Sequence, residues 1–187
     1  QNILKMVLDD LNDKDLICFL LEKQPYEDKG VYKNGFHLHF PNIFLSRVDQ
    51  EVHLIPRVQN IIREANTFSE LGIDDSSSVI DKACCNVPWL LYGSRKSEDM
   101  DPYIATKAYN SEGTELDLET ALENYVIYDM KENPIKVGKN VKKYLPRILS
   151  IIPYGRPVHN VKHGLSCPLK EKLIEKKERK KWKHLEK

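Results

Sequence analysis

The sequence lacks a long apolar run. The longest, Leu16–Leu21, has six residues, far short of the ~20 apolar residues that a helix needs to cross a bilayer. Cysteine is also sparse: the four cysteines, at positions 18, 84, 85 and 167, show no framework spacing, and neighbours such as Cys84 and Cys85 rarely pair with each other. We therefore expect reduced thiols and a cytoplasmic location.

A net charge of +1 conceals an uneven distribution of charge. Residues 169–187 contain 9 Lys or Arg and 4 Asp or Glu, so the remainder of the chain is mildly acidic. We predict a basic helical tail or connector there. The other residues have the balance of apolar and charged side chains that is typical of a folded domain.

Apolar spacing predicts a mixture of helices and strands. Residues 16–21 and 36–40 are expected to be strands that form a hairpin. Further strands are predicted at 79–81 and 89–92, and helices at 3–11, after Ser46 with a kink or restart at Pro56, and after Thr114, with 141–152 either helix or strand. The predicted fold class is α+β, an antiparallel-rich sheet covered by helices.

Two histidines alternate with apolar residues in the second of these strands. His37 and His39 lie between Phe36, Leu38 and Phe40, and alternate strand residues point to opposite faces. If the apolar side chains face a core, both histidines project together from the other face, where they could bind an anion or a metal. A half-exposed strand without a ligand fits the same pattern.

Asp81 and the turn that follows it form a second candidate site. A carboxylate at the end of the apolar strand Val79–Asp81 is costly unless it is paired or holds a cation. The turn Gly93–Lys96 offers small residues, backbone N–H groups and two cations, which suit a phosphate. An ordinary tight turn is the alternative.

Two other clusters carry less weight. Asp13 and Asp15 have the spacing of a carboxylate metal clamp, but they flank Lys14 in a polar break, so a solvated turn explains them better. His159, His163 and Cys167 are four residues apart, but Gly164 and Pro168 argue against a helix and no fourth zinc ligand is nearby.

Taken together, three segments resemble the archaeo-eukaryotic primases: Lys33–Phe40 (KNGFHLHF), the strand ending in Asp81, and Pro88–Lys96 (PWLLYGSRK). The nearest branch is the primase domain of the poxvirus-type primase–helicase proteins of nucleocytoplasmic large DNA viruses. The resemblance implies a DNA primase or primase–polymerase with an RRM-like sheet. It further implies Mg²⁺ or Mn²⁺, NTP or dNTP, a single-stranded DNA template, a downstream helicase domain, possible oligomers and location in a viral factory.

The resemblance also assigns roles to residues. Gly35-Phe36-His37 matches the small-x-His motif, which implies that His37 is catalytic and contacts the incoming triphosphate. Lys33, Gly35, Ser94, Arg95 and Lys96 are implied to bind nucleotide, and Asp81 to be a catalytic metal ligand.

The sequence departs from the family pattern in two places. Leu90 stands where some relatives carry a triphosphate-binding Arg. The paired acidic motif is absent, and it is expected upstream of residue 1, so we expect the 187-residue chain alone to be inactive. Residues 1–105 are then part of a primase catalytic domain, 106–168 its C-terminal extension and 169–187 the charged tail.

Two alternative functions remain open. His37-Leu38-His39 also fits the His-hydrophobe-His strand of rolling-circle endonucleases, in which both histidines bind one metal and a tyrosine attacks DNA. Tyr92 and Lys96 have the required spacing, but Gly93-Ser94 favours a turn over the helix that this pairing needs. A non-catalytic nucleic-acid-binding module is the other alternative.

Overall fold

A computed structural model describes residues 1–123, 125–138, 140–153 and 156–167. The chain divides into two compact units. Unit 1 contains residue 1 and residues 10–44 and 89–159, and unit 2 contains residues 2–9, 45–88 and 160 onward. The predicted domain boundaries stay predictions, and the predicted helical tail at 169–187 lies outside the described residues.

Unit 1 is built on a four-stranded antiparallel sheet in the order β4-β1-β5-β6. Its strands are β1 (Cys18–Glu22), β4 (Phe36–His39), β5 (Ile104–Tyr109) and β6 (Glu115–Leu116). β1 is almost continuously apolar because it lies at the centre of the sheet, between β4 and β5. The predicted hairpin of residues 16–21 and 36–40 is therefore confirmed.

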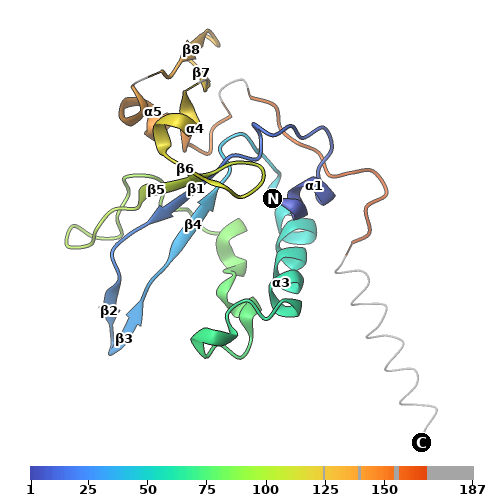
Figure 1. The fold of residues 1–187 in the computed structure, drawn as a ribbon, viewed down its shortest axis with the longest axis vertical. Coiled ribbons are helices and arrows are strands. Elements are labelled where there is room, and N and C mark those ends of the chain that lie inside the picture. Colours follow the sequence, from blue (N-terminus) through green and yellow to red (C-terminus); the bar gives the residue numbers. More distant parts are fainter. Residues whose placement is uncertain (124, 139, 154–155, 168–187) are drawn as a thin grey trace, which may run out of the picture. The chain divides into compact units, whose positions relative to one another are not determined.

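A two-stranded ribbon continues the β1 and β4 pair, as Figure 1 shows. It consists of β2 (Tyr26–Asp28) and β3 (Val31–Lys33), with Tyr26 opposite Lys33 and Glu27 opposite Tyr32. Lys29 and Gly30 form the tight turn with φ of 55° and 77°, the left-handed pair that two-residue hairpin loops require.

The remaining elements of unit 1 contribute to its core. They are α4 (Leu118–Leu122), β7 (Val126–Tyr128), β8 (Pro134–Lys136) and α5 (Val141–Ile148). Their apolar side chains join those of β1 and β5 in one buried cluster that includes Phe19, Ala108, Leu122, Val137 and Ile148. The ambiguous segment 141–152 is thus helical over its first part.

The expected helix start at Thr114 is wrong. Residues 115–116 pair with β5 as β6, and the helix begins after Asp117, whose carboxylate accepts the N–H of Thr120 at 2.8 Å. Asp117 therefore supplies the N-cap three residues later than expected.

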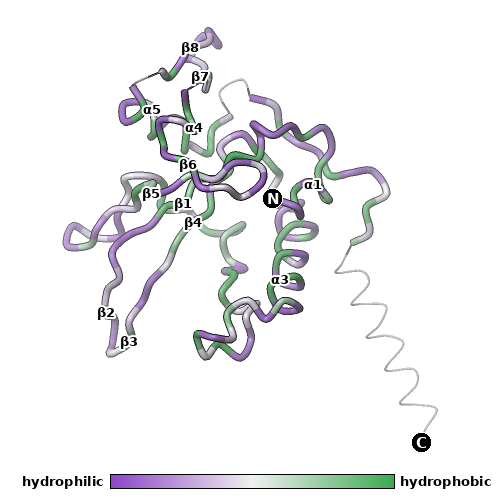
Figure 2. The backbone as a smooth tube through the Cα atoms, viewed as in Figure 1, coloured by the Kyte–Doolittle hydropathy of each residue, from purple (hydrophilic) through white to green (hydrophobic). Residues whose placement is uncertain are grey.

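The described elements of unit 2 are helical. They are α1 (Asn2–Val7), α2 (Arg47–Asp49), the π-turn η1 (Gln50–Leu54), α3 (Ile55–Glu64), and the 3₁₀ turns η2 (Ser69–Leu71), η3 (Ser76–Val79) and η4 (Lys82–Cys85). Ser46 caps α2 as predicted, because its hydroxyl accepts the N–H of Asp49 at 3.1 Å. Pro56 lies in the first turn of α3, after η1, so the helix restarts there. Figure 2 shows hydrophobic and hydrophilic residues mixed along α3.

The strands predicted at 79–81 and 89–92 are not present. The first segment contains the end of η3 and then Asp81, which caps η4, so local turns replace the extended backbone. The second segment runs into a turn closed by the Ser94 N–H on the Leu91 carbonyl at 2.9 Å. The α+β class and the antiparallel pairing are confirmed, whereas the RRM-like arrangement stays a prediction. No described helix is long and apolar enough to span a membrane.

Arg156 connects the last part of unit 1 to the residues that follow β4 through hydrogen bonds of its side chain. Its guanidinium donates to the carbonyls of Pro41 at 2.6 Å, Pro153 at 2.7 Å and Ile152 at 3.0 Å. It also contacts the Tyr125 hydroxyl and lies 4.6 Å from the centre of the Phe44 ring. These contacts connect segments that are distant in the sequence.

Replacing Arg156 by alanine should lower the free energy of unfolding by about 2 kcal/mol, because several carbonyls lose a charged donor. Urea denaturation followed by circular dichroism measures the change. Arg156→Lys keeps the positive charge but lacks the several N–H donors of the guanidinium, so it should recover only part of the lost free energy of unfolding. Arg47→Ala, on the exposed face of α2, is the matched control. An Arg156→Ala midpoint equal to that of Arg47→Ala would contradict this role.

Candidate functional site

The two histidines of β4 lie on the packed face of the sheet. His37 is opposite Leu21 and His39 opposite Phe19, and directly opposed residues share a face. Leu21 and Phe19 are buried, whereas Phe36 and Leu38 are 48% and 50% exposed. The expectation that Phe36 and Leu38 face the core is therefore wrong: aromatic side chains from residues 89 and 103 cover the histidine face instead.

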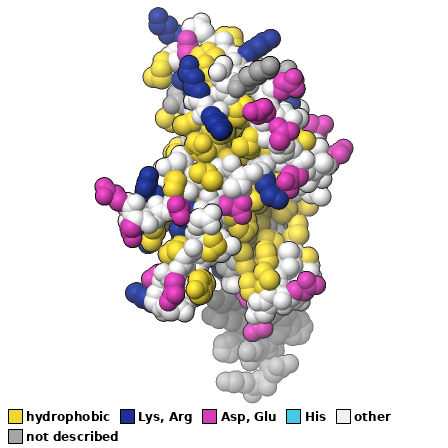
Figure 3. All heavy atoms as spheres, turned by 60° about the vertical axis from the view of Figure 1, so that its left-hand side comes forward, with side chains coloured by type: hydrophobic (Ala, Val, Ile, Leu, Met, Phe, Trp, Pro, Cys, Tyr) yellow, Lys and Arg dark blue, Asp and Glu magenta, His cyan; other side chains and the backbone are white. Residues whose placement is uncertain are grey.

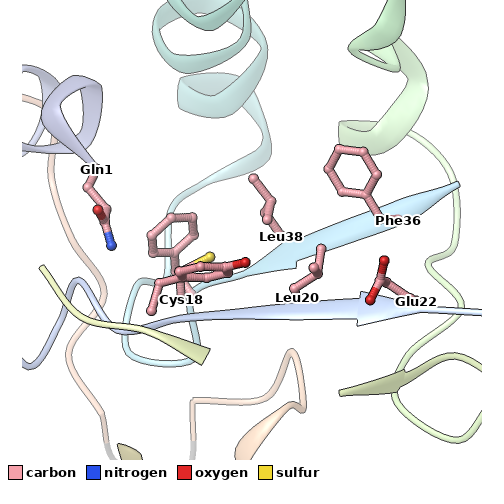
Figure 4. A pocket seen from close by; sticks show the side chains of 8 residues that line it. Gln1, Cys18, Leu20, Glu22, Phe36 and Leu38 are labelled. Carbon is pink, nitrogen blue, oxygen red and sulfur yellow. The ribbon is translucent and has the colours of Figure 1, made fainter. Parts of the chain in front are cut away.

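Phe36 and Leu38 line a hollow on the other face of β4 and β1. Figure 4 shows them beside Leu20 and Glu22, with Gln1 and Cys18 at one end. The lining is mostly apolar and its polar groups do not converge on one point, so we do not place the chemistry there.

His37 is held between two aromatic rings. Its ring stacks on Tyr103 with centroids 4.3 Å apart and planes 13° apart, and Trp89 approaches at 4.8 Å with a 43° tilt. Burial is the main cause that lowers the pKa of His37; the charge of Lys23 adds to it, and a backbone hydrogen bond to Leu90 acts against it. His37 Nδ1 is buried and has no hydrogen-bond partner among the described residues.

His39 is the more enclosed of the two. Burial, with smaller contributions from Arg156 and His37, lowers its pKa to about 4. Trp89 meets it edge-on at 6.4 Å. A neutral imidazole packed beside an arginine is suited to a structural role more than to contact with a phosphate.

Tyr103 brings the predicted nucleotide-binding residues together. Its N–H donates to the Ser94 carbonyl at 3.0 Å, and its own carbonyl accepts the Gly93 N–H at 2.7 Å. A Cβ at Gly35 would lie 3.6 Å from the Tyr103 hydroxyl. Gly35 and His37 therefore adjoin the Tyr103 side chain, and the turn at 93–94 is bonded to the Tyr103 backbone. Sequence reasoning missed this residue.

The predicted cations lie around the same surface. Lys33 forms an ion pair with Asp28. Their hydrogen bond, and to a smaller extent their opposite charges, raise the pKa of Lys33 and lower the pKa of Asp28. The charge of Lys96 lowers the Asp28 pKa as well, so it too is near. Arg95 donates to the Glu98 carbonyl at 3.1 Å. Figure 3 shows acidic and basic side chains interspersed over one face, so no broad single-sign field is seen in that view.

Asp81 belongs to unit 2 and caps the 3₁₀ turn η4 there. One carboxylate oxygen accepts the Ala83 N–H at 2.8 Å and the side chain is exposed. Within the described residues, no group of three or more His, Cys, Asp or Glu side chains is placed to hold a metal ion. Asp81 could supply one ligand, but it does not by itself fit a two-metal centre.

The other sequence clusters have local explanations. Asp15 accepts the N–H of Asn12 at 3.0 Å, and Asn12 accepts that of Lys14, which confirms the polar turn. His159 Nδ1 accepts the N–H of Phe44 at 3.4 Å, and His163 and Cys167 belong to the other unit. Cys84 and Cys85 have their sulfur atoms 3.9 Å apart, and none of the four cysteines, all described, forms a disulfide.

Comparisons with known proteins place the chain in a family. Residues 1–109 match the family model described as "C962R protein N-terminal AEP domain", the archaeo-eukaryotic primase domain. The chain is 36% identical over 183 residues to "Putative helicase 121R" of Invertebrate iridescent virus 3, covering 95% of this chain and 19% of that protein. It is 33% identical over 162 residues to "Putative helicase 184R" of Invertebrate iridescent virus 6, covering 80% of this chain and 16% of that protein.

A third relative, "Putative helicase 022R" of Frog virus 3, is 26% identical over 149 residues, which are 78% of this chain and 14% of that protein. The chain thus spans less than a fifth of the length of these relatives. No solved structure matches it significantly. Because the family model covers more than half of the chain, from α1 to the end of β5, the chain belongs to the archaeo-eukaryotic primase family of the C962R type.

Proposed function

We propose that this chain is part of the nucleotidyl-transfer domain of a viral primase–helicase, which synthesises primers on single-stranded DNA from NTP or dNTP. One observation carries the proposal. The small-x-His segment and the turn of PWLLYGSRK, which are 56 residues apart between His37 and Gly93, meet at Tyr103 within one unit of the fold. Two of the three motif segments therefore lie together in unit 1, whereas Asp81 belongs to unit 2.

The chain's own residues account for nucleotide binding in this proposal. Gly35 lies beside Tyr103, the Gly93–Lys96 turn offers the cations Arg95 and Lys96, and His37 supplies a fixed imidazole. The N–H groups of Gly93 and Ser94 are bonded within the fold, so the cations are what the turn contributes. Donors held in place before the reaction stabilise the charge that grows on the departing pyrophosphate. Tyr103 and Trp89 act as positioning residues that keep the His37 ring in one orientation.

The divalent metal contributes the remaining chemistry. Mg²⁺ or Mn²⁺, when bound, stabilises the attacking and leaving oxygens of the transfer. Asp81 is the residue proposed to hold it, together with carboxylates outside the described residues, since this part of the chain provides no complete ligand group.

The helicase names of the relatives support a helicase domain in the same polypeptide as this chain. Primer synthesis and strand separation act on the same DNA, so a shared polypeptide would keep the two active sites on one template. Because the relatives are viral proteins, we propose that the chain serves the replication of viral DNA. The corresponding location is the cytoplasmic site at which that replication takes place.

The endonuclease alternative fits the structure less well. A metal shared by His37 and His39 requires accessible ring nitrogens, but His37 is stacked between two rings and the Nδ1 atoms of both histidines are buried. Tyr92, the candidate nucleophile, packs against the buried cluster of unit 1. The structure offers no specific observation in favour of this reaction.

His37 should matter more than His39 for nucleotide binding. His37→Ala in the full-length protein should reduce primer synthesis at least about a hundredfold, the scale of losing one charge-stabilising donor. His39→Ala should mainly lower thermal stability, because its ring fills packed space beside Arg156. Primer extension and thermal unfolding of both variants separate the two effects. Equal and severe loss of activity in both, with loss of bound metal, would favour the endonuclease.

Asp81→Asn in the full-length protein should reduce primer synthesis to background while leaving the fold intact. Asparagine preserves an oxygen that can cap Ala83, so the change removes the charge and keeps the turn. Asp75→Asn is a matched control, because Asp75 caps η3 in the same manner. Primer synthesis with Mg²⁺ or Mn²⁺ and circular dichroism are the measurements. Primer synthesis by Asp81→Asn at the wild-type level would contradict the proposal that Asp81 is a metal ligand.

Tyr92 should not form a covalent link to DNA, since its ring packs against the apolar cluster and its backbone leads directly into the Gly93 turn. Incubation with single-stranded DNA and Mn²⁺, followed by denaturing electrophoresis, tests this, with Tyr92→Phe as the comparison. A protein–DNA adduct that disappears in Tyr92→Phe would overturn the primase proposal.

A further inference from the structure

Lys23 lies beside the His37 surface, although no motif points to it. It follows β1 directly and is half-buried. Its Nζ is 4.2 Å from the centre of the Tyr26 ring and 5.3 Å from that of Tyr103, the ring on which His37 stacks. Two aromatic side chains therefore hold this ammonium group on the same side of the fold as Gly35 and His37.

The charge of Lys23 is less compensated than that of its neighbours. Lys33, the cation expected from the family motif, is paired with Asp28, and Arg95 is bonded to the Glu98 carbonyl. In the described part of the chain, by contrast, no carboxylate lies within 4.0 Å of the Lys23 ammonium. Contact with a ring face attracts a cation but leaves its full charge in place.

We propose that Lys23 is a phosphate-binding residue of this site, and that the Tyr26 and Tyr103 rings position its ammonium group for that purpose. This inference rests on the proposed primase function. An ammonium has three donors and suits a phosphate as a point charge. Because the rings already restrict the long side chain, less rotamer entropy is lost when an anion binds than for an exposed lysine.

The neighbourhood of His37 agrees with an anion at this point. The Lys23 charge acts on the imidazole in the direction that disfavours its protonation. A phosphate group near both side chains would be attracted to Lys23, and its negative charge would act on the His37 pKa in the direction opposite to Lys23. The phosphate could be the triphosphate of a nucleotide or the backbone of a DNA strand, which have the same charged oxygens.

The test compares Lys23→Gln with Lys131→Gln, an equal change of charge at an exposed residue between β7 and β8 of the same unit. Binding of sodium tripolyphosphate, of dATP and of a thymidine oligonucleotide to the full-length protein is measured by calorimetry at several salt concentrations. Lys23→Gln should weaken binding about tenfold, the loss of one charged hydrogen bond. Lys131→Gln should leave it unchanged, and Lys23→Arg should restore it, which also controls for folding.

The outcomes separate the sources and the claims. If Lys23→Gln binds tripolyphosphate and dATP more weakly than wild type, Lys23 contacts the nucleotide. If only binding of the oligonucleotide is weakened, and the slope of log affinity against log salt concentration is smaller by about one, Lys23 contacts the DNA backbone. If wild type binds these ligands and Lys23→Gln binds them as Lys131→Gln does, the inference is wrong while the proposed function stands. If wild type binds none of them, both are overturned.

Discussion

The stacking of His37 on Tyr103 is the contact on which the rest of the candidate site depends. It fixes the imidazole, and the Tyr103 backbone holds the Gly93–Ser94 turn through two hydrogen bonds. Tyr103 also meets Gly35 and, through its ring face, Lys23. A single buried tyrosine thus contacts the strand and the cation through its ring and the turn through its backbone, so displacement of this residue would disturb all three.

This arrangement also explains why the histidine face is packed rather than open. Phe36 and Leu38 share the outer face of β4, while the side chains of residues 37 and 39 point toward the aromatic cluster. Strand alternation predicted that the two sets would lie on opposite faces, and this is correct. It could not decide which face is buried, because that depends on Trp89 and Tyr103, residues far along the chain.

Elements with strong local determinants were predictable. The hairpin of β1 and β4 follows from two apolar segments, and Ser46 was recognised as an N-cap. The predicted strand at Asp81 failed because the Asp75 and Asp81 carboxylates bond to nearby backbone N–H groups and favour short turns. The motifs singled out Gly35, His37 and the 93–96 turn, whereas Tyr103 and Lys23 stand in no motif and are connected to these residues only by tertiary contacts.

The order of segments in unit 1 has a consequence for its synthesis. β1 and β4 leave the ribosome close together, but Thr106 of β5 contacts Leu20 across 86 positions, and Arg156 reaches Pro41 across 115. The early hairpin therefore has one unpaired apolar edge until the second half of the unit has been translated. The intervening residues 45–88 belong to the other unit. Residues of the helical unit are therefore synthesised after β1 and β4 but before β5 and β6, so the four-stranded sheet cannot form until they have been translated.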